Sequence, residues 1–362
     1  MNRLEPGQST HVYDYSADPR LLLGLLADPI RSLRNGGTPV VHVRRGWLHG
    51  SHLVVTARPI TGASVDLSAF ATTAGDVASQ LAASPPSEPE YLARAGQLAR
   101  SENVSEPLLP LHPQGFTRVG PAARPAEWSD QLLDARDQLT GWLLEPLLRT
   151  AALAPGVLLP HAARVLALAA LAHPFGIGIA TLSMRSHTEG IWSATGGTVD
   201  LRTEFTERFQ RDRGFFLSAL SGLTAAGLAD DEADLLRSWN AALHLCWGTA
   251  SALAASGTVD EAQLQAGRLR ESPLDNGVPS PFHQAARLAG VGGDERQPYW
   301  HIAQRMVLNV LYGAFACLGI APVQRYYLCF GVSSTADALL GEDWSQRLEQ
   351  IGRLQSSLAA SS

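Results

Sequence analysis

The chain contains no lysine, and all 28 of its basic residues are arginine. A GC-rich genome is a sufficient explanation for such a bias. Whatever its origin, the absence excludes a pyridoxal Schiff base, a phosphate-loop lysine and other lysine-based covalent catalysis. Any chemistry of this protein must therefore use other residue types.

Cysteine is scarce, and long hydrophobic runs are missing. Cys246, Cys317 and Cys329 are scattered without CxxC spacing, which argues against a disulfide framework or a structural zinc site. The longest apolar stretch, 165–172, falls well short of the roughly 18 residues that a membrane helix needs. The first residues lack the apolar segment of a signal peptide. We expect a cytoplasmic protein with no membrane contact.

The net charge of -6 gives no overall basic surplus of the kind that nucleic-acid binding requires. Nucleic acid is therefore not an expected partner, and an acidic partner would have to bind local arginine clusters. Hydrophobic residues make up 45% of the chain and charged residues 17%, which is typical of a globular protein. Its 362 residues suffice for one elaborated domain or two domains.

The N-terminal part of the sequence mixes helical and strand patterns. Residues 20–35 predict an amphipathic helix, and 38–58 predict a β-hairpin around the turn Gly46 to Gly50. Helical segments follow at 73–102, and the proline-rich stretch 105–126 predicts an extended arm. We interpret 1–362 as a single catalytic domain, with a possible leader-binding subdomain at 1–104 set off by this arm.

The rest of the chain is mainly helical in pattern. Helices are predicted over 128–149 and 160–171, from Asp200 and from Asp230, and a proline-rich loop at 272–284. Small and β-branched residues alternate at 173–192, which indicates a strand there. The predicted fold class is α+β, mostly helical with a small antiparallel β-sheet.

One predicted helix carries the sharpest group of polar residues. Pro298 suits its first turn and Gly319 and Pro322 its end. It is apolar nearly all round, except for a seam that consists of His301, Arg305, Asn309 and Tyr312, with Gln304 beside it. Unpaired polar groups in a core cost roughly 1–3 kcal/mol each, so the seam faces either internal partners or a wet pocket. In the second case His301 and Tyr312 would move protons, while Gln304, Arg305 and Asn309 would hold amide carbonyls.

Other motifs give weaker signals. Gly176 and Gly178 begin a dinucleotide-like loop, but the third glycine is absent. His42, His49 and His52 crowd the hairpin and fit either a metal site or, more simply, hydrogen-bonded structural histidines. No GxSxG motif or Cys/His signature supports a nucleophilic hydrolase.

Two groups of arginines are candidate binding residues. The first consists of Arg202, Arg208, Arg211 and Arg213, interleaved with Glu204 and Glu207 at helical spacing. A self-paired, solvated helix face is one interpretation, and docking of an acidic peptide is the other. Arg44 and Arg45 on the hairpin allow the same two interpretations.

Two segments resemble a known family. The hairpin sequence VVHVRRGWLHGSHLVV is similar to the N-terminal strand pair of the glutamate-elimination domain of lanthipeptide dehydratases, where a FIRY-like run precedes HLRLR. The stretch 301–327, with LN at 308–309 and LGIAP before RYY, resembles the C-terminal region of that domain. The same scaffold includes the pyridine synthases of thiopeptide biosynthesis, formal [4+2] cyclases that act on a leader-bearing peptide.

The departures from the family pattern favour the cyclases. Val54 and Thr56 stand near the family's arginines, and Arg305 and Val307 stand where the eliminating enzymes have histidines. The resemblance implies a pyridine synthase that joins two dehydroalanines, then releases water and the leader peptide as an amide, with no metal or other cofactor. Its partners would be the modified precursor peptide and, as further candidates, other peptide-modifying enzymes.

Aromatic walls suit a substrate rich in thiazoles and alkenes, so further substrate-binding residues are expected beside the seam. These are Trp300, Tyr299, Trp192 and Tyr327, with Ser186 and His187 on an opposite wall. Two alternatives remain open at this point. One is a glutamyl-eliminating lyase on the same scaffold, and the other is a non-catalytic peptide-binding scaffold.

Overall fold

The predicted hairpin supplies one edge strand and its inner neighbour in a four-stranded antiparallel sheet. In the computed structural model, β2 (Val40–Gly46) pairs with β3 (His52–Arg58), and β3 pairs with β1 (Gln8–Tyr13). The turn between β2 and β3 needs left-handed backbone, with φ of 63° at His49 and 124° at Gly50, and the glycine adopts it without strain. The hairpin prediction is confirmed.

The opposite edge strand of the sheet comes from the stretch that we predicted to be an extended arm. β4 (Thr117–Pro121) pairs with β1, which gives the strand order β2-β3-β1-β4. Residues 105–126 therefore contain part of the sheet and do not act as a simple linker. Neither β1 nor β4 was predicted, since each is short and its sequence is rich in polar residues or interrupted by glycine and proline.

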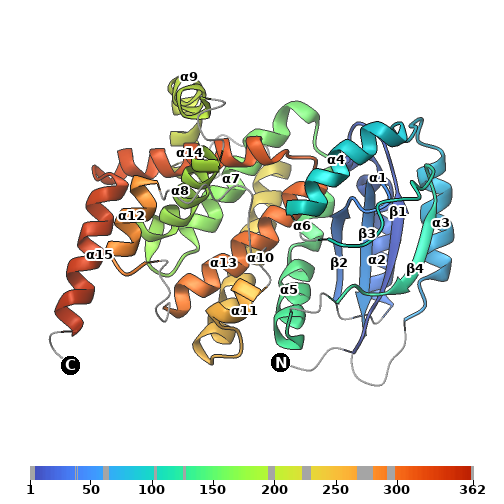
Figure 1. Cartoon of the computed structure of the whole chain (residues 1–362), viewed down its shortest axis with the longest axis horizontal. Coiled ribbons are helices and arrows are strands. Elements are labelled where there is room, and N and C mark those ends of the chain that lie inside the picture. Colours follow the sequence, from blue (N-terminus) through green and yellow to red (C-terminus); the bar gives the residue numbers. More distant parts are fainter. Residues whose placement is uncertain are drawn as a thin grey trace. The chain divides into compact units, whose positions relative to one another are not determined.

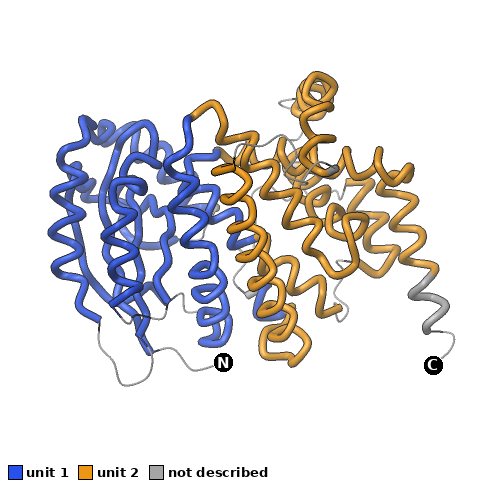
Figure 2. Tube along the Cα trace, turned by 180° about the vertical axis from the view of Figure 1, so that it is seen from behind, with its two compact units in different colours: residues 1–154, 262–270, 309–320 blue, residues 155–261, 271–308, 321–362 orange. Residues whose placement is uncertain are grey.

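The structure describes residues 5–36, 38, 40–59, 65–101, 104–124, 128–194, 200–221, 230–266, 280–291 and 298–359. Tertiary contacts divide the chain into two compact units, shown in Figure 2. Unit 1 comprises residues 1–154, 262–270 and 309–320, and unit 2 comprises the remainder. The main division follows Ala154, beyond the predicted arm. Among the described residues, no helix is both long and apolar enough to cross a membrane.

Unit 1 surrounds the sheet with helices (Figure 1). The helix predicted over 20–35 is two helices, α1 (Arg20–Leu25) and α2 (Ala27–Asn35). The helical segments predicted over 73–102 are α3 (Ser68–Ser79) and α4 (Glu88–Ser101). α5 (Asp130–Trp142) and α6 (Leu144–Ala151) complete the unit, and α5 packs against β2 while α3 packs against β1 and β4.

The regular secondary structure in the described part of unit 2 is all helical. Its helices are α7 (Pro155–Leu171), α8 (Gly176–Ala194), α9 (Leu201–Ser221), α10 (Asp230–Ala255), α12 (Pro281–Leu288), α14 (Pro322–Leu340) and α15 (Trp344–Ala359). α11 (Glu261–Ala266) and α13 (Tyr299–Cys317) each contribute residues to both units. The loop predicted at 272–284 lies outside the described residues as far as 279, and it is wrong over 281–284, where Ser280 caps α12 and Pro281 occupies its first turn.

The strand predicted at 173–192 is wrong, because residues 173–175 form a turn and the remainder belong to α8. Its β-branched residues suggested a strand, but packing decides the structure. α8 packs along α14 and also contacts α7 and α12, so a helix of small and branched residues is buried on several sides. Tertiary burial outweighs a β preference that is worth less than about 1 kcal/mol per residue.

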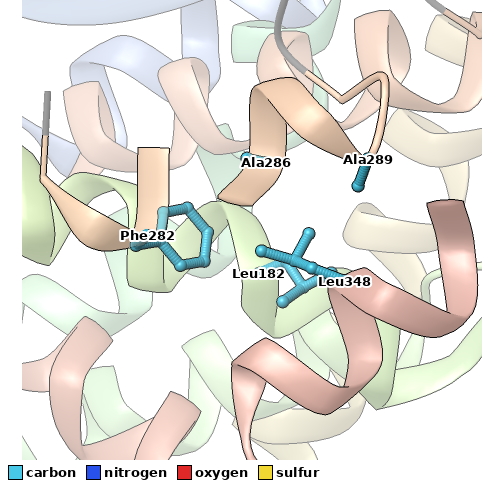
Figure 3. Close-up of a cluster of buried hydrophobic side chains, with 5 residues drawn as sticks. All are labelled: Leu182, Phe282, Ala286, Ala289 and Leu348. Atoms are coloured by element: carbon cyan, nitrogen blue, oxygen red, sulfur yellow. The ribbon is translucent and has the colours of Figure 1, made fainter. Parts of the chain in front are cut away.

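A small apolar cluster connects α8 with the C-terminal helices. It consists of Leu182, Phe282, Ala286, Ala289 and Leu348, drawn in Figure 3. Phe282 is 3% exposed, and full burial of such a side chain contributes roughly 1.5–3 kcal/mol. The cluster fixes α12 and α15 against α8, and α8 in turn carries three of the predicted substrate-binding residues.

Candidate functional site

An arginine–aromatic cluster in unit 2 brings together four of the predicted substrate-binding residues: Trp192 from α8, Arg202 and Arg208 from α9, and Tyr327 from α14. The Cζ atom of Arg202 lies 4.1 Å from the Trp192 ring centroid, and that of Arg208 lies 4.1 Å from the Tyr327 ring centroid. Both distances are typical of cation–π contacts. The two arginines are six residues apart on α9, which places them about 120° apart around the helix axis, so each lies over a different ring.

Two carboxylates neutralise this arginine–aromatic cluster in part. Glu189 is 1% exposed and accepts hydrogen bonds from Arg185 Nε at 3.0 Å and Arg202 Nη2 at 3.1 Å. Asp212 Oδ2 accepts from the Tyr327 hydroxyl at 2.7 Å and from Arg208 Nε at 3.3 Å. Arg202 thus pairs with Glu189 and Arg208 with Asp212, whereas the spacing in the sequence suggests pairing with the interleaved Glu204 and Glu207. Burial and the bond to Asp212 raise the pKa of Tyr327, so its hydroxyl stays protonated.

The cluster remains open to an incoming ligand. The side chains of Arg202 and Arg208 are 54% and 45% exposed, despite their ion pairs. Arg211 lies on the same helix and is exposed as well. An acidic segment could therefore exchange water for charge-assisted hydrogen bonds while the aromatic faces stay in place.

Ser186 of α8 takes part in a different contact, one that sequence reasoning missed. Its Oγ lies 3.0 Å from His283 Nε2, and Ser280 Oγ lies 3.0 Å from His283 Nδ1. Ser280 also caps α12, accepting from the His283 backbone N–H at 3.3 Å. Ser280 before Pro281 was a readable helix start, but no local pattern pairs residue 186 with residue 283. His187 is half-buried one position further along α8.

The predicted polar seam of α13 is divided among several environments. Gln304 is buried and donates to the Ala180 carbonyl at 2.6 Å, and Arg305 pairs with Glu261. These two contacts fit the interpretation of an internal hydrogen-bond network. His301 is half-buried, Tyr312 is buried and Asn309 is exposed. His301 and Arg305 belong to unit 2, whereas the helix from Asn309 onward belongs to unit 1.

Trp300 belongs to a second aromatic group within unit 2. Its ring centroid lies 5.9 Å from that of His173 and 5.8 Å from that of Phe175, both edge-on. Tyr299 and Phe175 are 42% and 52% exposed, so this group reaches the surface. Burial lowers the pKa of His173 to about 4, which keeps the ring neutral.

Arg44 and Arg45, the predicted binding residues of the hairpin, lie on opposite faces of β2. Burial and the nearby Arg136 lower the pKa of Arg44 to about 10, and burial likewise lowers that of Arg45. Arg45 Nη2 donates to Ser51 Oγ at 2.5 Å. These side chains are far less exposed than Arg202 and Arg208, so they suit contact with a buried group better than capture of a peptide from solution.

The histidines that crowd the hairpin have separate partners. His42 Nε2 lies 3.2 Å from Asp137 Oδ1, His49 contacts the ring of His112, and His52 contacts His11. Among the described residues, no group of three or more His, Cys, Asp or Glu could hold a metal ion. His11 carried no sequence signal, because β1 was not predicted.

Comparison with solved structures decides the fold. The pyridine synthase TbtD from thiomuracin biosynthesis superposes with a TM-score of 0.66 and 22% identity, over 93% of this chain and 99% of its own. The chain has the fold of this pyridine synthase. TsrL superposes with a TM-score of 0.58 and 13% identity, over 95% and 98% of the two chains. No protein-family model and no curated protein sequence matches the chain.

The predicted resemblance to thiopeptide pyridine synthases is thus confirmed at the level of the fold. Both superpositions run over nearly the whole of each chain, so the sheet of unit 1 and the helices of unit 2 are both included. The fold class predicted from sequence, α+β with a small antiparallel sheet, is also confirmed.

Proposed function

We propose that the protein is a pyridine synthase of thiopeptide biosynthesis that acts on a leader-bearing precursor peptide. The observation that carries the proposal is the near end-to-end superposition on TbtD. A shared fold can host unrelated functions, so the site must supply further support. The arginine–aromatic cluster of unit 2 gives that support, because it offers exposed cations next to flat aromatic faces.

The proposed reaction is a formal [4+2] addition between two dehydroalanines of one peptide. One dehydroalanine reacts as its iminol tautomer, a 2-azadiene with carbon at both ends, and two new C–C bonds to the second dehydroalanine close a six-membered ring that contains the amide nitrogen. Loss of water and then of the leader peptide as an amide makes the ring aromatic. The reactive alkenes need to be held in near-attack geometry, for which effective molarities of about 10⁵–10⁸ M are known in favourable cases.

The arginine–aromatic cluster is proposed to hold the peptide. Arg202 and Arg208 would contact acidic leader residues, with Arg211 as an additional exposed cation on α9. Trp192 and Tyr327 offer aromatic surface against which thiazole rings can pack. The Tyr327 hydroxyl stays protonated and donates a hydrogen bond to Asp212. We therefore assign Tyr327 a role in substrate binding rather than in proton transfer.

The roles of the α13 residues remain part of the proposal. His301 and Tyr312 are proposed to move protons, and Asn309, which is exposed, to hold an amide group. Gln304 and Arg305 already bond to Ala180 and Glu261, so substitution of these two should affect stability more than turnover.

The test is to incubate the protein with a leader-bearing peptide that contains two dehydroalanines and to follow it by mass spectrometry. The expected products are a macrocycle and free leader amide. Loss of glutamate from a glutamylated peptide would instead indicate an eliminating lyase. Unchanged peptide that nevertheless binds tightly would indicate a non-catalytic scaffold.

A further inference from the structure

Two histidines on adjacent strands of unit 1 form a hydrogen-bonded pair. His11 of β1 and His52 of β3 face the same side of the sheet, since His11 lies opposite Val54 and Tyr13 opposite His52. His11 Nδ1 lies 3.1 Å from His52 Nε2, and His52 Nδ1 lies 2.8 Å from the Gly50 carbonyl oxygen. The ring centroids of the two histidines are 5.0 Å apart.

This geometry fixes the proton on each ring. The Gly50 carbonyl can only accept, so His52 Nδ1 carries the hydrogen of that bond. Neutral His52 then has a lone pair on Nε2, which accepts from His11 Nδ1–H. His11 Nε2 is left with a lone pair, and no residue in the described part of the chain hydrogen-bonds to it.

Both rings are neutral at physiological pH. Burial lowers the pKa of His11 to about 4, with Arg118 and Arg44 adding to the effect. Burial likewise lowers the pKa of His52 to about 3, and the nearby His11, Arg45 and Arg118 lower it further. The hydrogen bond to the Gly50 carbonyl has the opposite effect but is outweighed. The assignment of hydrogens therefore holds at pH 7.

The lone pair of His11 lies among positive groups. Arg118 of β4 is directly opposite His11, and Arg44 of β2 is opposite Val54, the same residue that His11 faces. Arg118 is exposed and His11 half-buried, so a ligand can reach this part of the sheet. A base next to fixed cations suits a substrate that loses a proton and develops negative charge on oxygen.

We infer that His11 Nε2 is a proton-accepting catalytic group for amide-bearing peptide substrates, positioned by His52. The inference rests on the proposed function, in which one dehydroalanine must become its iminol. Nε2 removes the amide N–H proton, the nitrogen lone pair forms the C=N bond, and the carbonyl π pair moves to oxygen. The resulting imidazolium returns the same proton to that oxygen, so no proton is gained or lost. Arg44 and Arg118 stabilise the intermediate oxyanion.

The first test needs no substrate. Nitrogen-15 NMR of histidine-labelled protein at pH 7 distinguishes a protonated ring nitrogen from one with a lone pair. We expect His11 to carry its proton on Nδ1 and to titrate near pH 4, and Arg118→Gln to raise that pKa. A proton on His11 Nε2 at pH 7 would overturn the inference.

The second test separates catalysis from structure. Asparagine at position 11 can still donate an N–H to His52 but has no basic nitrogen, so H11N preserves the strand contact and removes the base. We expect kcat to fall about 10²-fold or more, with peptide affinity changed less than about threefold. His244→Asn, at an exposed position on α10, serves as the control and should retain full activity.

The outcomes of the second test are distinguishable from those for the proposed function. Turnover by wild-type protein and equal turnover by H11N would refute the role of His11 and leave the proposed function standing. No turnover by folded wild-type protein would refute both. Loss of turnover together with a lower melting temperature would count against a specifically catalytic role.

Discussion

The guanidinium of Arg202 lies 4.1 Å from the Trp192 ring centroid, and the same group donates to the buried carboxylate of Glu189. One side chain thus connects an aromatic face, a buried charge and the solvent. If this arrangement binds an acidic leader segment, Arg202→Gln should weaken peptide binding by about tenfold, the loss of one charge-assisted contact. Stability should change by less than about 1 kcal/mol, since the side chain is 54% exposed.

Fluorescence anisotropy with a labelled leader peptide measures this affinity. Arg237→Gln is the matched control, because Arg237 is an exposed arginine of α10 that pairs only weakly with Asp234 at 3.5 Å. Equal loss of affinity in the two variants would point to general charge attraction and contradict a defined site at Arg202.

Asp137 of α5 is a buried carboxylate that contacts side chains of β2, β3 and α5 in unit 1. It contacts His42 at 3.2 Å, Arg58 at 3.1 Å and Arg136 at 2.6 Å. Burial alone would raise the pKa of Asp137, but His42 and Arg136 outweigh it and hold the pKa well below its usual range. Asp137→Asn should lower the free energy of unfolding by about 3 kcal/mol at pH 7, because buried cations lose their counter-charge.

The pH dependence of Asp137→Asn follows from the sign of that shift. A carboxylate with a depressed folded-state pKa stabilises the protein above its unfolded pKa, about 3.9, and loses this contribution as pH falls further. The difference between variant and wild type should therefore shrink below about pH 4 in denaturant titrations. Asp130→Asn, at an exposed pair with Arg124, should cost less than about 1 kcal/mol at any pH.

His161 is a buried ring in α7 for which the described residues offer neither nitrogen a hydrogen bond. Burial, assisted by Arg164, lowers its pKa to about 4. Replacement by leucine removes an unsatisfied polar group of similar size, so His161→Leu should raise the free energy of unfolding by about 1–2 kcal/mol at pH 7.

The gain from His161→Leu should grow as the solution becomes acidic. Between the unfolded pKa of about 6.5 and the folded value near 4, the unfolded wild-type chain binds the extra proton and is favoured. Urea titrations at pH 7 and pH 5 measure this, with exposed His244→Leu as the control. A destabilised H161L variant at both pH values would mean that the ring has a polar partner.

Gly331 lets α14 pack closely on α9. A methyl group at this position would lie 2.1 Å from Cζ of Phe216, which is itself buried. Gly331→Ala should therefore destabilise the protein by about 1–3 kcal/mol through overpacking, even though alanine favours helices. Gly214→Ala on α9 has open space and should instead stabilise by about 0.5–1 kcal/mol. In thermal unfolding, the melting temperature should fall for Gly331→Ala and rise for Gly214→Ala.

Local patterns in the sequence were sufficient for some elements and not for others. The hairpin of β2 and β3 alternates clearly around a glycine turn, and α13 has proline and glycine at its ends, so both were predictable. β1 and β4 were missed because short polar strands depend on partners distant in the chain. α8 was taken for a strand because its β-branched residues hide the helical packing against α14.

The candidate site shows the same limit. The residues Trp192, Arg202, Arg208 and Tyr327 could be selected by type, since exposed arginines and aromatic residues suit a peptide. Their pairing across three helices, and the buried carboxylate of Glu189 between two arginines, depends on tertiary contacts. His11 was beyond sequence reasoning, because its importance arises only when β1 places it beside His52.

The most direct test of the account is the mass balance of a single reaction. A leader-bearing peptide with two dehydroalanines is incubated with the purified protein, and all products are identified by mass spectrometry. We predict a macrocycle lighter than the precursor by one water and one leader amide, with the leader amide released in equal amount. Unchanged precursor in the presence of folded protein would contradict the account.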